Sequence, residues 1–450
     1  MARPATLACL LGILALFVLA RNRRMHTSKA LWIPVAWLLI AGSRPVSEWA
    51  SAGPAAGPLD QVNVEANPLN VVVFSILLTA GFMVLIARRR EVLKLVGANW
   101  LVLLFFSYCL LSTLWSDFPG AAFRKWIRSL GDPVMVLILL TDANPMAALQ
   151  RLLARAGFLL LPLSVLLIKY YPALGRAYNN SWQPMYTGVT DNKNTLGMIC
   201  LVVGIGFTWR LFEHYRAKGE AGRGRFLFAD GAILAMILWL LRMAHSVTSA
   251  CCLAMGAVLL AVTQRSAQRQ KLGVLHLLVA VLLSIPVFAL FFDSGGGLVE
   301  SLGRNPTLTG RTEIWRQVLG MARNPLVGTG FESFWLGDRF REMSDNNPNA
   351  TLNEAHNGYI EIYLNLGWCG VTLVAALIVT GYRKVMAAVR RDPCAGGLRL
   401  AYFVAAVSYS LTEAGFRMLV PVWIFFLWAT ICVPKRRPIP SGIAAYGEAV

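Results

Sequence analysis

The chain has 450 residues, of which 56% are hydrophobic and 14% are charged, and its formal net charge is +19. Soluble domains carry about 25% charged residues, so this composition excludes an ordinary soluble enzyme. No nucleic-acid partner is expected, because Lys and Arg punctuate apolar runs instead of forming one patch. Apolar runs approach the roughly 20 residues of a spanning helix again and again. The sequence therefore predicts an all-α, polytopic membrane helix bundle that forms a single membrane-embedded domain over residues 1–450.

Apolar segments follow one another along the chain and predict about 12–13 transmembrane helices. We interpret the first as a retained helix, because Arg21, Arg23 and Arg24 follow it directly and a cleavable signal peptide lacks this flank. The segments lie near residues 4–20, 30–42, 69–87, 97–114, 131–142, 156–169, 195–210, 226–242, 249–263, 272–292, 358–381, 398–414 and 418–433.

Clusters rich in Lys and Arg set the orientation of these segments. They lie at residues 21–29, 88–90, 210–225, 265–271, 383–399 and 435–437. All six are cytoplasmic at once if the apolar segments between them span, and short cytoplasmic loops favour basic residues. The C-terminus is then cytoplasmic, and the N-terminus is external if every segment spans. None of the eight cysteines falls in an external segment, so no disulfide framework or metal cluster is indicated.

This orientation leaves one long external loop, over residues 293–353. Within it, Gly310 precedes a segment in which Ile314, Val318 and Met321 recur at helical spacing. We expect an amphipathic helix that lies on the membrane surface or against the bundle. Aromatic and apolar content argues against disorder, and ordered loops of this length are usually functional.

The residues that follow the long loop are the first candidates for chemistry. If residues 353–363 are helical, His356, Tyr359 and Tyr363 form one polar stripe at the mouth of the bundle. An imidazole with an ordinary pKa of about 6.5 can accept a proton at neutral pH, so His356 is the catalytic candidate. The alternative is an interfacial residue solvated by lipid headgroups. The supporting candidates are Glu354, Asn357, Tyr359 and Glu361.

Arginine and lysine residues of the external segments are candidates for binding phosphate. Arg311 begins the predicted loop helix, where backbone N–H groups already favour an anion and a guanidinium adds a bidentate contact. The alternative is a solvated helix face shared with Arg316 and Arg323. Snorkelling to headgroups is the corresponding alternative for Arg242. The further candidates are Arg124, Arg128, Lys193, Arg242 and Arg417.

Several catalytic motifs are missing from the sequence. It contains no P-loop, no HExxH motif or Cys and His cluster, and no GxSxG elbow. We therefore expect neither a cofactor nor a catalytic metal, and the reaction energy must come from the substrate itself, as with an activated lipid pyrophosphate.

A set of ordered motifs resembles the O-antigen ligase and polymerase superfamily. The first four occupy residues 308–315 (LTGRTEIW), 324–331 (NPLVGTGF), 355–359 (AHNGY) and 364–367 (LNLG). Trp115-Ser116, residues 188–197 (GVTDNKNTLG) and residues 246–249 (SVTS) are similar to the exopolysaccharide-production branch. The resemblance spans roughly residues 95–430.

The resemblance implies a metal-independent, inverting glycosyltransferase of the bacterial inner membrane, acting at the periplasmic face. Its donor would be a glycan linked to undecaprenyl pyrophosphate, its acceptor a glycan or lipid A-core, and its further partners membrane lipids and polysaccharide assembly and export proteins. His356 would be the base or hydroxyl-orienting group, and Arg311 the pyrophosphate ligand. A second family arginine belongs in the SVTS motif, where this sequence has Val247, with Arg242 some residues earlier.

Polymerisation of repeat units, ligation to lipid A-core and glycosylation of a protein remain open within this class, and residues 191–194 favour exopolysaccharide polymerisation. A flippase for lipid-linked glycans is the alternative function, although its cavity would need charges along several spans. An amino-acid or ion permease is disfavoured by the long external loop and by the lack of paired broken helices.

Overall fold

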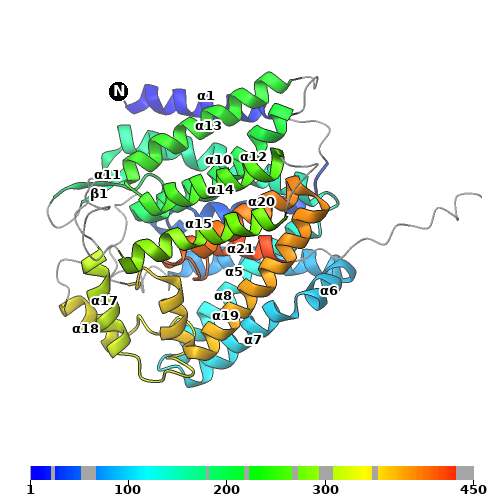
Figure 1. Ribbon diagram of the computed structural model, residues 1–450. Helices are drawn as coiled ribbons and strands as arrows, with labels where there is room; N and C mark the ends of the chain where they lie inside the picture. Colours follow the sequence, from blue (N-terminus) through cyan, green and yellow to red (C-terminus); the bar gives the residue numbers. More distant parts are fainter. Residues whose placement is uncertain are drawn as a thin grey trace, which may run out of the picture.

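The computed structural model describes residues 2–21, 26–51, 67–178, 182–216, 222–265, 272–292, 308–346 and 353–431 (Figure 1). This part of the chain is a bundle of α-helices with one small antiparallel hairpin, β1 (Arg176–Tyr178) and β2 (Pro184–Tyr186). Arg176 pairs with Tyr186 in its register. The expectation of an all-α, polytopic membrane bundle is confirmed.

Seven of the described helices are long and apolar enough to cross a membrane. They are α1 (Ala2–Leu19), α5 (Pro68–Ala87), α10 (Pro145–Tyr170), α12 (Lys193–Arg216), α13 (Arg223–Ala244), α14 (Val247–Arg265) and α19 (Gly358–Arg391). An eighth span results if α6 (Arg89–Ala98) and α7 (Trp100–Ser112), which meet at a bend of 86°, are taken together. Two further helices complete the bundle: α15 (Leu272–Phe292), and α20 (Pro393–Tyr409), which is mostly buried between α14, α19 and α21.

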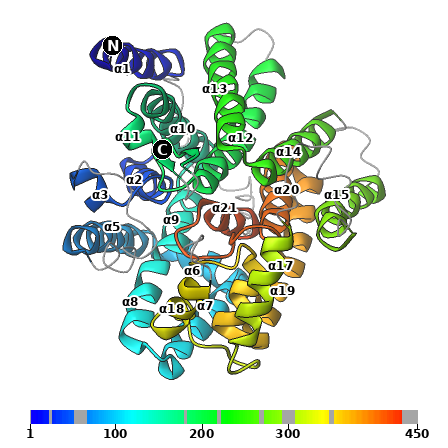
Figure 2. The ribbon, with the colours of Figure 1, turned by 90° about the vertical axis from the view of Figure 1, so that its left-hand side faces the viewer.

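Three of the predicted spans are helices of only ten residues. These are α2 (Trp32–Ala41), α9 (Gly131–Leu140) and α21 (Pro421–Thr430). At 1.5 Å per residue each is about 15 Å long, half the roughly 30 Å of a bilayer core. α21 lies at the centre of the molecule when it is seen from the end that carries α17 and α18 (Figure 2). None of the three is therefore long enough to cross a bilayer core by itself.

The longest helix, α19, is broken at Gly367, whose φ is +63° and ψ −165°. The loop of residues 324–330 supplies hydrogen bonds at the break: Trp368 N–H donates to Pro325 O (2.8 Å) and Cys369 N–H to Leu326 O (3.1 Å). In return, Thr329 and Gly330 donate to the carbonyls of Leu364 and Asn365. A Cβ at Gly367 would collide with the backbone of Leu326. The NPLVGTGF and LNLG motifs therefore form one unit, in which glycine permits the close approach.

Helix α17 (Leu308–Gly320) confirms the helix predicted in the long loop, and it lies against the bundle. Its Trp315 indole donates to Ala355 O at 2.8 Å. Val318 packs in a small core with Phe334, Trp335, Met343, Ala355 and Leu364. As predicted, Arg316 and Arg323 lie on the exposed face. Helix α18 (Asp338–Asn346) follows, and its Arg339 pairs with Asp117 at 2.8 Å.

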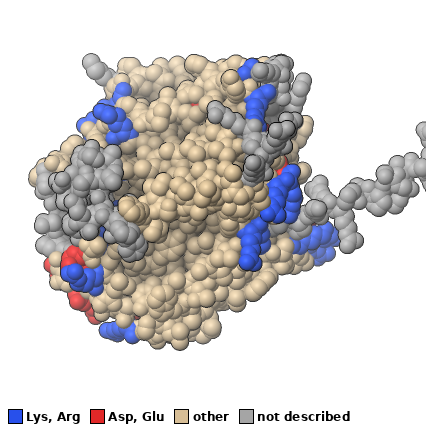
Figure 3. Space-filling view, in the orientation of Figure 1, with Lys and Arg blue, Asp and Glu red and all other residues tan. Residues whose placement is uncertain are grey.

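The basic clusters lie at one end of the bundle, which we call the basic end. Lys384 donates to Asn99 Oδ1 beside α6 (2.6 Å), and Arg225 donates to Arg21 O (3.2 Å). Lys and Arg side chains gather along the right-hand edge in Figure 3. α17, α18 and the N-terminus lie at the opposite end (Figure 1). The predicted clusters at 265–271 and 435–437 fall largely outside the described residues, as do residues 293–307 and 347–352 of the long loop.

The break in α19 predicts a specific cost for losing glycine. We expect Gly367→Ala to lower the Tm of the purified protein by several degrees, because a non-glycine residue at positive φ costs about 1–3 kcal/mol and its Cβ meets Leu326. Gly231→Ala is the matched control, because a Cβ there meets nothing within 4 Å on helix α13. Thermal unfolding in detergent, followed by tryptophan fluorescence, makes the comparison. Equal Tm values for the two variants would contradict this account of the break.

Candidate active site

A cavity of about 240 Å³ opens at the end opposite the basic end. We call it the polar cavity. It lies among four segments that are far apart in the sequence. These are the start of α12, the loop between α17 and α18 that contains Glu332, the segment before α19, and the loop of residues 411–420. Its lining residues are Asp191, Asn192, Asn194, Thr195, Met198, Glu332, Asn353, Glu354, Tyr409, Glu413, Ala414, Arg417, Met418, Leu419 and Val420.

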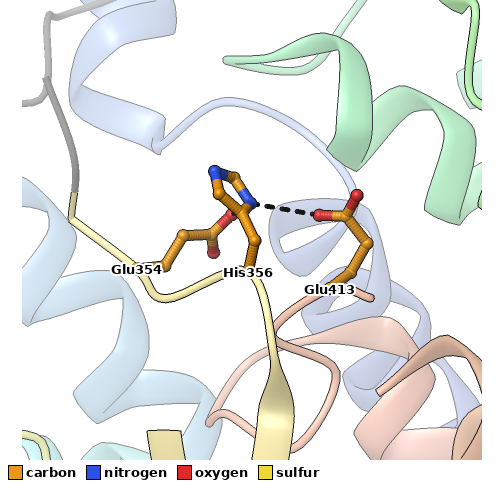
Figure 4. Close-up of side chains that lie close together, drawn as sticks. All are labelled: Glu354, His356 and Glu413. Atoms are coloured by element: carbon orange, nitrogen blue, oxygen red, sulfur yellow. Dashed lines mark hydrogen bonds and ion pairs between the residues drawn. The ribbon is translucent and has the colours of Figure 1, made fainter. Parts of the chain in front are cut away.

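His356 lies beside this cavity between two carboxylates (Figure 4). Its Nδ1 is 2.9 Å from Glu354 Oε1 and 3.3 Å from Glu413 Oε2. The other ring nitrogen, Nε2, points away from both carboxylates. The predicted stripe of His356, Tyr359 and Tyr363 on one helix is wrong, because Asn357 caps α19 and the helix begins at Gly358. His356 instead has a left-handed backbone, with φ +49°.

The two carboxylates set the charge of His356. Burial alone disfavours an imidazolium, but Glu354 and Glu413 outweigh this effect and raise the pKa of His356 to about 10. Burial likewise opposes ionisation of Glu354, whereas His356, Arg417 and Arg311 lower its pKa to about 2. The ordinary histidine pKa expected from the sequence does not hold. At neutral pH the group is an ion pair in which Nδ1–H is donated to carboxylate and Nε2 also carries a proton.

Glu413 joins the separate parts of the site. Its Oε1 accepts from Arg311 Nη2 at 3.0 Å, and its Oε2 accepts from Asn194 Nδ2 at 3.3 Å. Arg311 also donates to Thr412 O (2.6 Å), and the Thr412 hydroxyl bonds to that of Thr248 (3.0 Å). The GRTE, DNKN and SVTS motifs thus meet at a loop that carries no recognised motif.

Arg417 is the second cation of the site. Its guanidinium contacts Glu332 Oε2 at 3.3 Å and Glu354 Oε2 at 3.6 Å, and it donates to Asn353 O. Burial disfavours its charge, but the surrounding carboxylates more than compensate and raise its pKa. Arg417 therefore stays charged at every pH at which the protein is folded.

The predicted supporting residues hold the backbone around His356. Glu361 is buried and accepts from the Trp335 indole (3.0 Å) and from Ala355 N–H. Asn357 donates to Leu411 O at 2.9 Å, and the Tyr359 hydroxyl donates to Val407 O at 3.1 Å. These side chains fix the segment before α19 against three neighbours: Asn357 against the 411–420 loop, Tyr359 against α20, and Glu361 against Trp335. Only Glu354 of the supporting set lines the polar cavity.

Two buried residues, Asp132 and Arg44, form hydrogen bonds to the backbone of the loops that surround the polar cavity. Asp132, at the start of α9, accepts from Leu419 N–H at 2.9 Å and from the Trp37 indole at 3.0 Å. Leu419 has a φ of +59°, so this bond fixes a strained residue two positions after Arg417. Arg44, which follows α2, holds the loop that contains the DNKN motif in the same way. Its backbone N–H donates to Val189 O and its Nε donates to Thr190 O.

Of the six predicted phosphate-binding residues, only Arg417 lines the polar cavity. Arg311 lies behind the lining residue Glu413, and the other four lie elsewhere. Arg124 is exposed on α8 (Pro119–Ser129), and Arg128 of the same helix lies 4.9 Å from the ring centre of Phe74. Arg242 is exposed at the end of α13. Lys193 is the first residue of α12, and the turn there presents Asn192 and Asn194 to the cavity instead.

Glu354, His356 and Glu413 are also spaced as metal ligands. Their ligand atoms lie within 4.8 Å of one another, and one imidazole with two carboxylates suits a divalent cation. In the structure, however, cations of the protein already neutralise both carboxylates: Arg311 and His356 contact Glu413, and Arg417 and His356 contact Glu354. A metal ion would have to replace these contacts.

Two comparisons with known proteins bear on the family resemblance of this chain. A model of the O-antigen ligase family matches residues 230–375, which include Arg311 and His356. The chain is also 25% identical, over 396 residues, to the exopolysaccharide production protein ExoQ of Rhizobium meliloti (strain 1021). That alignment covers 81% of this chain and 86% of the rhizobial protein. Together these matches confirm the predicted resemblance of the chain to the O-antigen ligase and polymerase superfamily.

Proposed function

We propose that this protein transfers a glycan, at the polar cavity, from an undecaprenyl-pyrophosphate-linked donor to a hydroxyl of an acceptor sugar. The reaction inverts the configuration of the anomeric carbon and needs no metal. The observation that supports this most strongly is the convergence of His356, Arg311 and Arg417 at one end of a membrane bundle. Glycosyl transfer from a pyrophosphate requires a base for the acceptor and cations for the leaving group. Arg417 lines the polar cavity, and His356 and Arg311 border it through contacts with the lining carboxylates Glu354 and Glu413.

The reaction is a single displacement. The acceptor oxygen attacks the anomeric carbon, the bond from that carbon to the phosphate oxygen breaks, and its electron pair leaves with the pyrophosphate. The acceptor proton passes to His356 Nε2 in the fraction of molecules in which this nitrogen is unprotonated. Glu354 and Glu413 stabilise the resulting imidazolium through Nδ1. Arg311 and Arg417 bind the pyrophosphate as its charge increases.

The similarity to a rhizobial exopolysaccharide production protein favours polymerisation of repeat units over ligation to lipid A-core. The basic end faces the cytoplasm by the positive-inside preference, so the polar cavity opens to the periplasm from the inner membrane. A flippase is less well supported, because the charged groups gather at one end and the spans between them are apolar.

The pKa of His356 predicts how the rate depends on pH. Only the neutral imidazole can accept a proton, so with a pKa of about 10 we expect kcat/KM to rise about tenfold per pH unit between pH 6 and 9. Glu354→Gln removes a carboxylate that raises this pKa, and its rate should level off at lower pH. Purified protein, one lipid-linked donor and one acceptor suffice for both profiles.

His356→Ala should abolish transfer without loss of expression or membrane insertion. Near-wild-type polymer from this variant, or a wild-type rate that is constant from pH 6 to 9, would contradict a role for His356 as the base.

Arg311 tests the pyrophosphate site. A charge-assisted hydrogen bond contributes about 1.5–3 kcal/mol, so Arg311→Ala should reduce transfer at least about tenfold, with Arg311→Lys intermediate because it loses the bidentate fork. The matched control is Arg316→Ala, since the Arg316 side chain is 80% exposed on the same helix. We expect the control to be nearly silent.

Arg311 also neutralises Glu413, so a double variant separates the two roles. If Arg311 binds pyrophosphate, Arg311→Ala combined with Glu413→Gln should stay at least as impaired as Arg311→Ala alone. Recovery of transfer in the double variant would show that Arg311 only balances the charge of Glu413.

Chelation tests metal independence. We expect transfer by the purified protein to continue unchanged in excess EDTA, because Arg311, Arg417 and His356 supply the positive charge. Loss of activity in EDTA, with recovery on adding Mg²⁺ or Mn²⁺, would assign Glu354, His356 and Glu413 as metal ligands instead.

A further inference from the structure

A second, larger cavity lies near the basic end, between α5, α6, α7 and α9. Its volume is about 450 Å³, and we call it the basic-end groove. Its walls are almost entirely apolar, with Leu85, Leu93, Val102, Phe106 and Leu137 among the lining residues and Arg89 at its rim. The polar cavity chemistry described above does not use any of these side chains.

The bend of 86° between α6 and α7 creates this groove. Because α6 turns away from the direction of the spans, it lies across the end of α5 and α7 as an amphipathic helix (Figure 1). Val92, Leu95 and Val96 of α6 line the groove, whereas Arg90 and Lys94 lie on its exposed face. A helix with this division of residues lies at the interface between headgroups and acyl chains.

The charge at the rim favours an anionic occupant. Arg88 is engaged within the protein, donating to Ile138 O and to the Thr141 hydroxyl. Arg89 is exposed, and it makes no hydrogen bond or ion pair with any residue in the part of the chain that the structure describes. A free guanidinium at headgroup depth binds phosphate, and the cytoplasmic leaflet contains anionic lipids.

The size of the groove fits one lipid chain. At about 30 Å³ for each water-sized group, 450 Å³ has room for about fifteen such groups, the length of a single acyl chain. We propose that the basic-end groove binds one acyl chain of an anionic phospholipid of the cytoplasmic leaflet, with the lipid phosphate at Arg89.

The structure offers an internal control for this site. Another apolar groove, of about 380 Å³, lies between α1, α10 and α13, and Leu16, Pro162, Leu166 and Phe228 are among its lining residues. No Lys or Arg lines it. It should bind acyl chains of any phospholipid, whatever the headgroup. Comparing the two grooves therefore distinguishes binding of the acyl chain from preference for an anionic headgroup.

The test is photo-crosslinking of the full-length protein in lipid nanodiscs. The probes are phosphatidylglycerol and phosphatidylcholine, each with a diazirine on one acyl chain, and the labelled peptides are mapped by mass spectrometry. We expect phosphatidylglycerol to label the α6 and α9 peptides about fivefold more than phosphatidylcholine, the preference that one basic residue near an anionic surface gives. The α1 and α10 peptides should show no preference.

Two variants complete the experiment. Arg89→Gln should remove the preference while chain labelling remains, and Leu93→Trp, on the exposed helix α6, should fill the groove and reduce labelling by both lipids. Equal labelling of α6 and α9 by the two probes in the wild type, or unchanged labelling in Leu93→Trp, would overturn the proposal. Displacement of the phosphatidylglycerol probe by equimolar polyprenyl phosphate would overturn it too, by assigning the groove to the donor chain.

Discussion

Backbone that enters the depth of a bilayer must find hydrogen-bond partners within the protein, because no water is available there. This constraint bears on α9 and α21, whose ten residues each give about half the length of a bilayer core, so the chain beside them needs partners within the protein. Each loop is tied to buried polar groups. Asp132 accepts from Leu419, Arg44 donates to Val189 and Thr190, and Asn365 Oδ1 accepts from the backbone of Ser333 and Phe334. Buried polar residues that appear unrelated to chemistry thereby place the catalytic candidates.

The charges of the site balance one another. Glu332, Glu354 and Glu413 face Arg311, Arg417 and the His356 imidazolium, in contacts of 2.9 to 3.6 Å. Breaking a buried pair by removing one partner costs about 3–5 kcal/mol, so the six groups stabilise one another before any substrate binds. In the proposed reaction, an incoming pyrophosphate would compete with these carboxylates for the arginines. Donor binding would then release carboxylates that can orient the acceptor or its proton.

Hydropathy and local periodicity were sufficient to predict the helical class, the long spans and helix α17. His356, Glu354 and Arg417 could also be predicted as candidates, because charged residues near the ends of apolar segments are expensive without a partner or a function, and Arg311 could be predicted because it begins a helix. The first argument also applies to Glu413, near the end of the apolar segment at 398–414. The ion pairs of the site could not be predicted from the sequence, because the partners are far apart in the chain: Glu413, the partner of Arg311, is 102 residues away. The stripe failed for a local reason, since an Asn-Gly pair can cap a helix and move its start beyond His356.

The broken helix α19 has a consequence for how this sequence can vary. Residues 324–330 and 364–369 exchange backbone hydrogen bonds across Gly367, so together they act as a single discontinuous helix turn assembled from two places in the chain. Lengthening or shortening either piece by one residue would misalign donors and acceptors on both sides of the break. The intervening stretch, which includes α18, enters this exchange only at its two ends. Insertions and deletions should therefore accumulate within the intervening stretch but away from Glu332 and from the segment that begins at Asn353, where relatives can reshape the mouth of the site while the turn beneath it keeps its length.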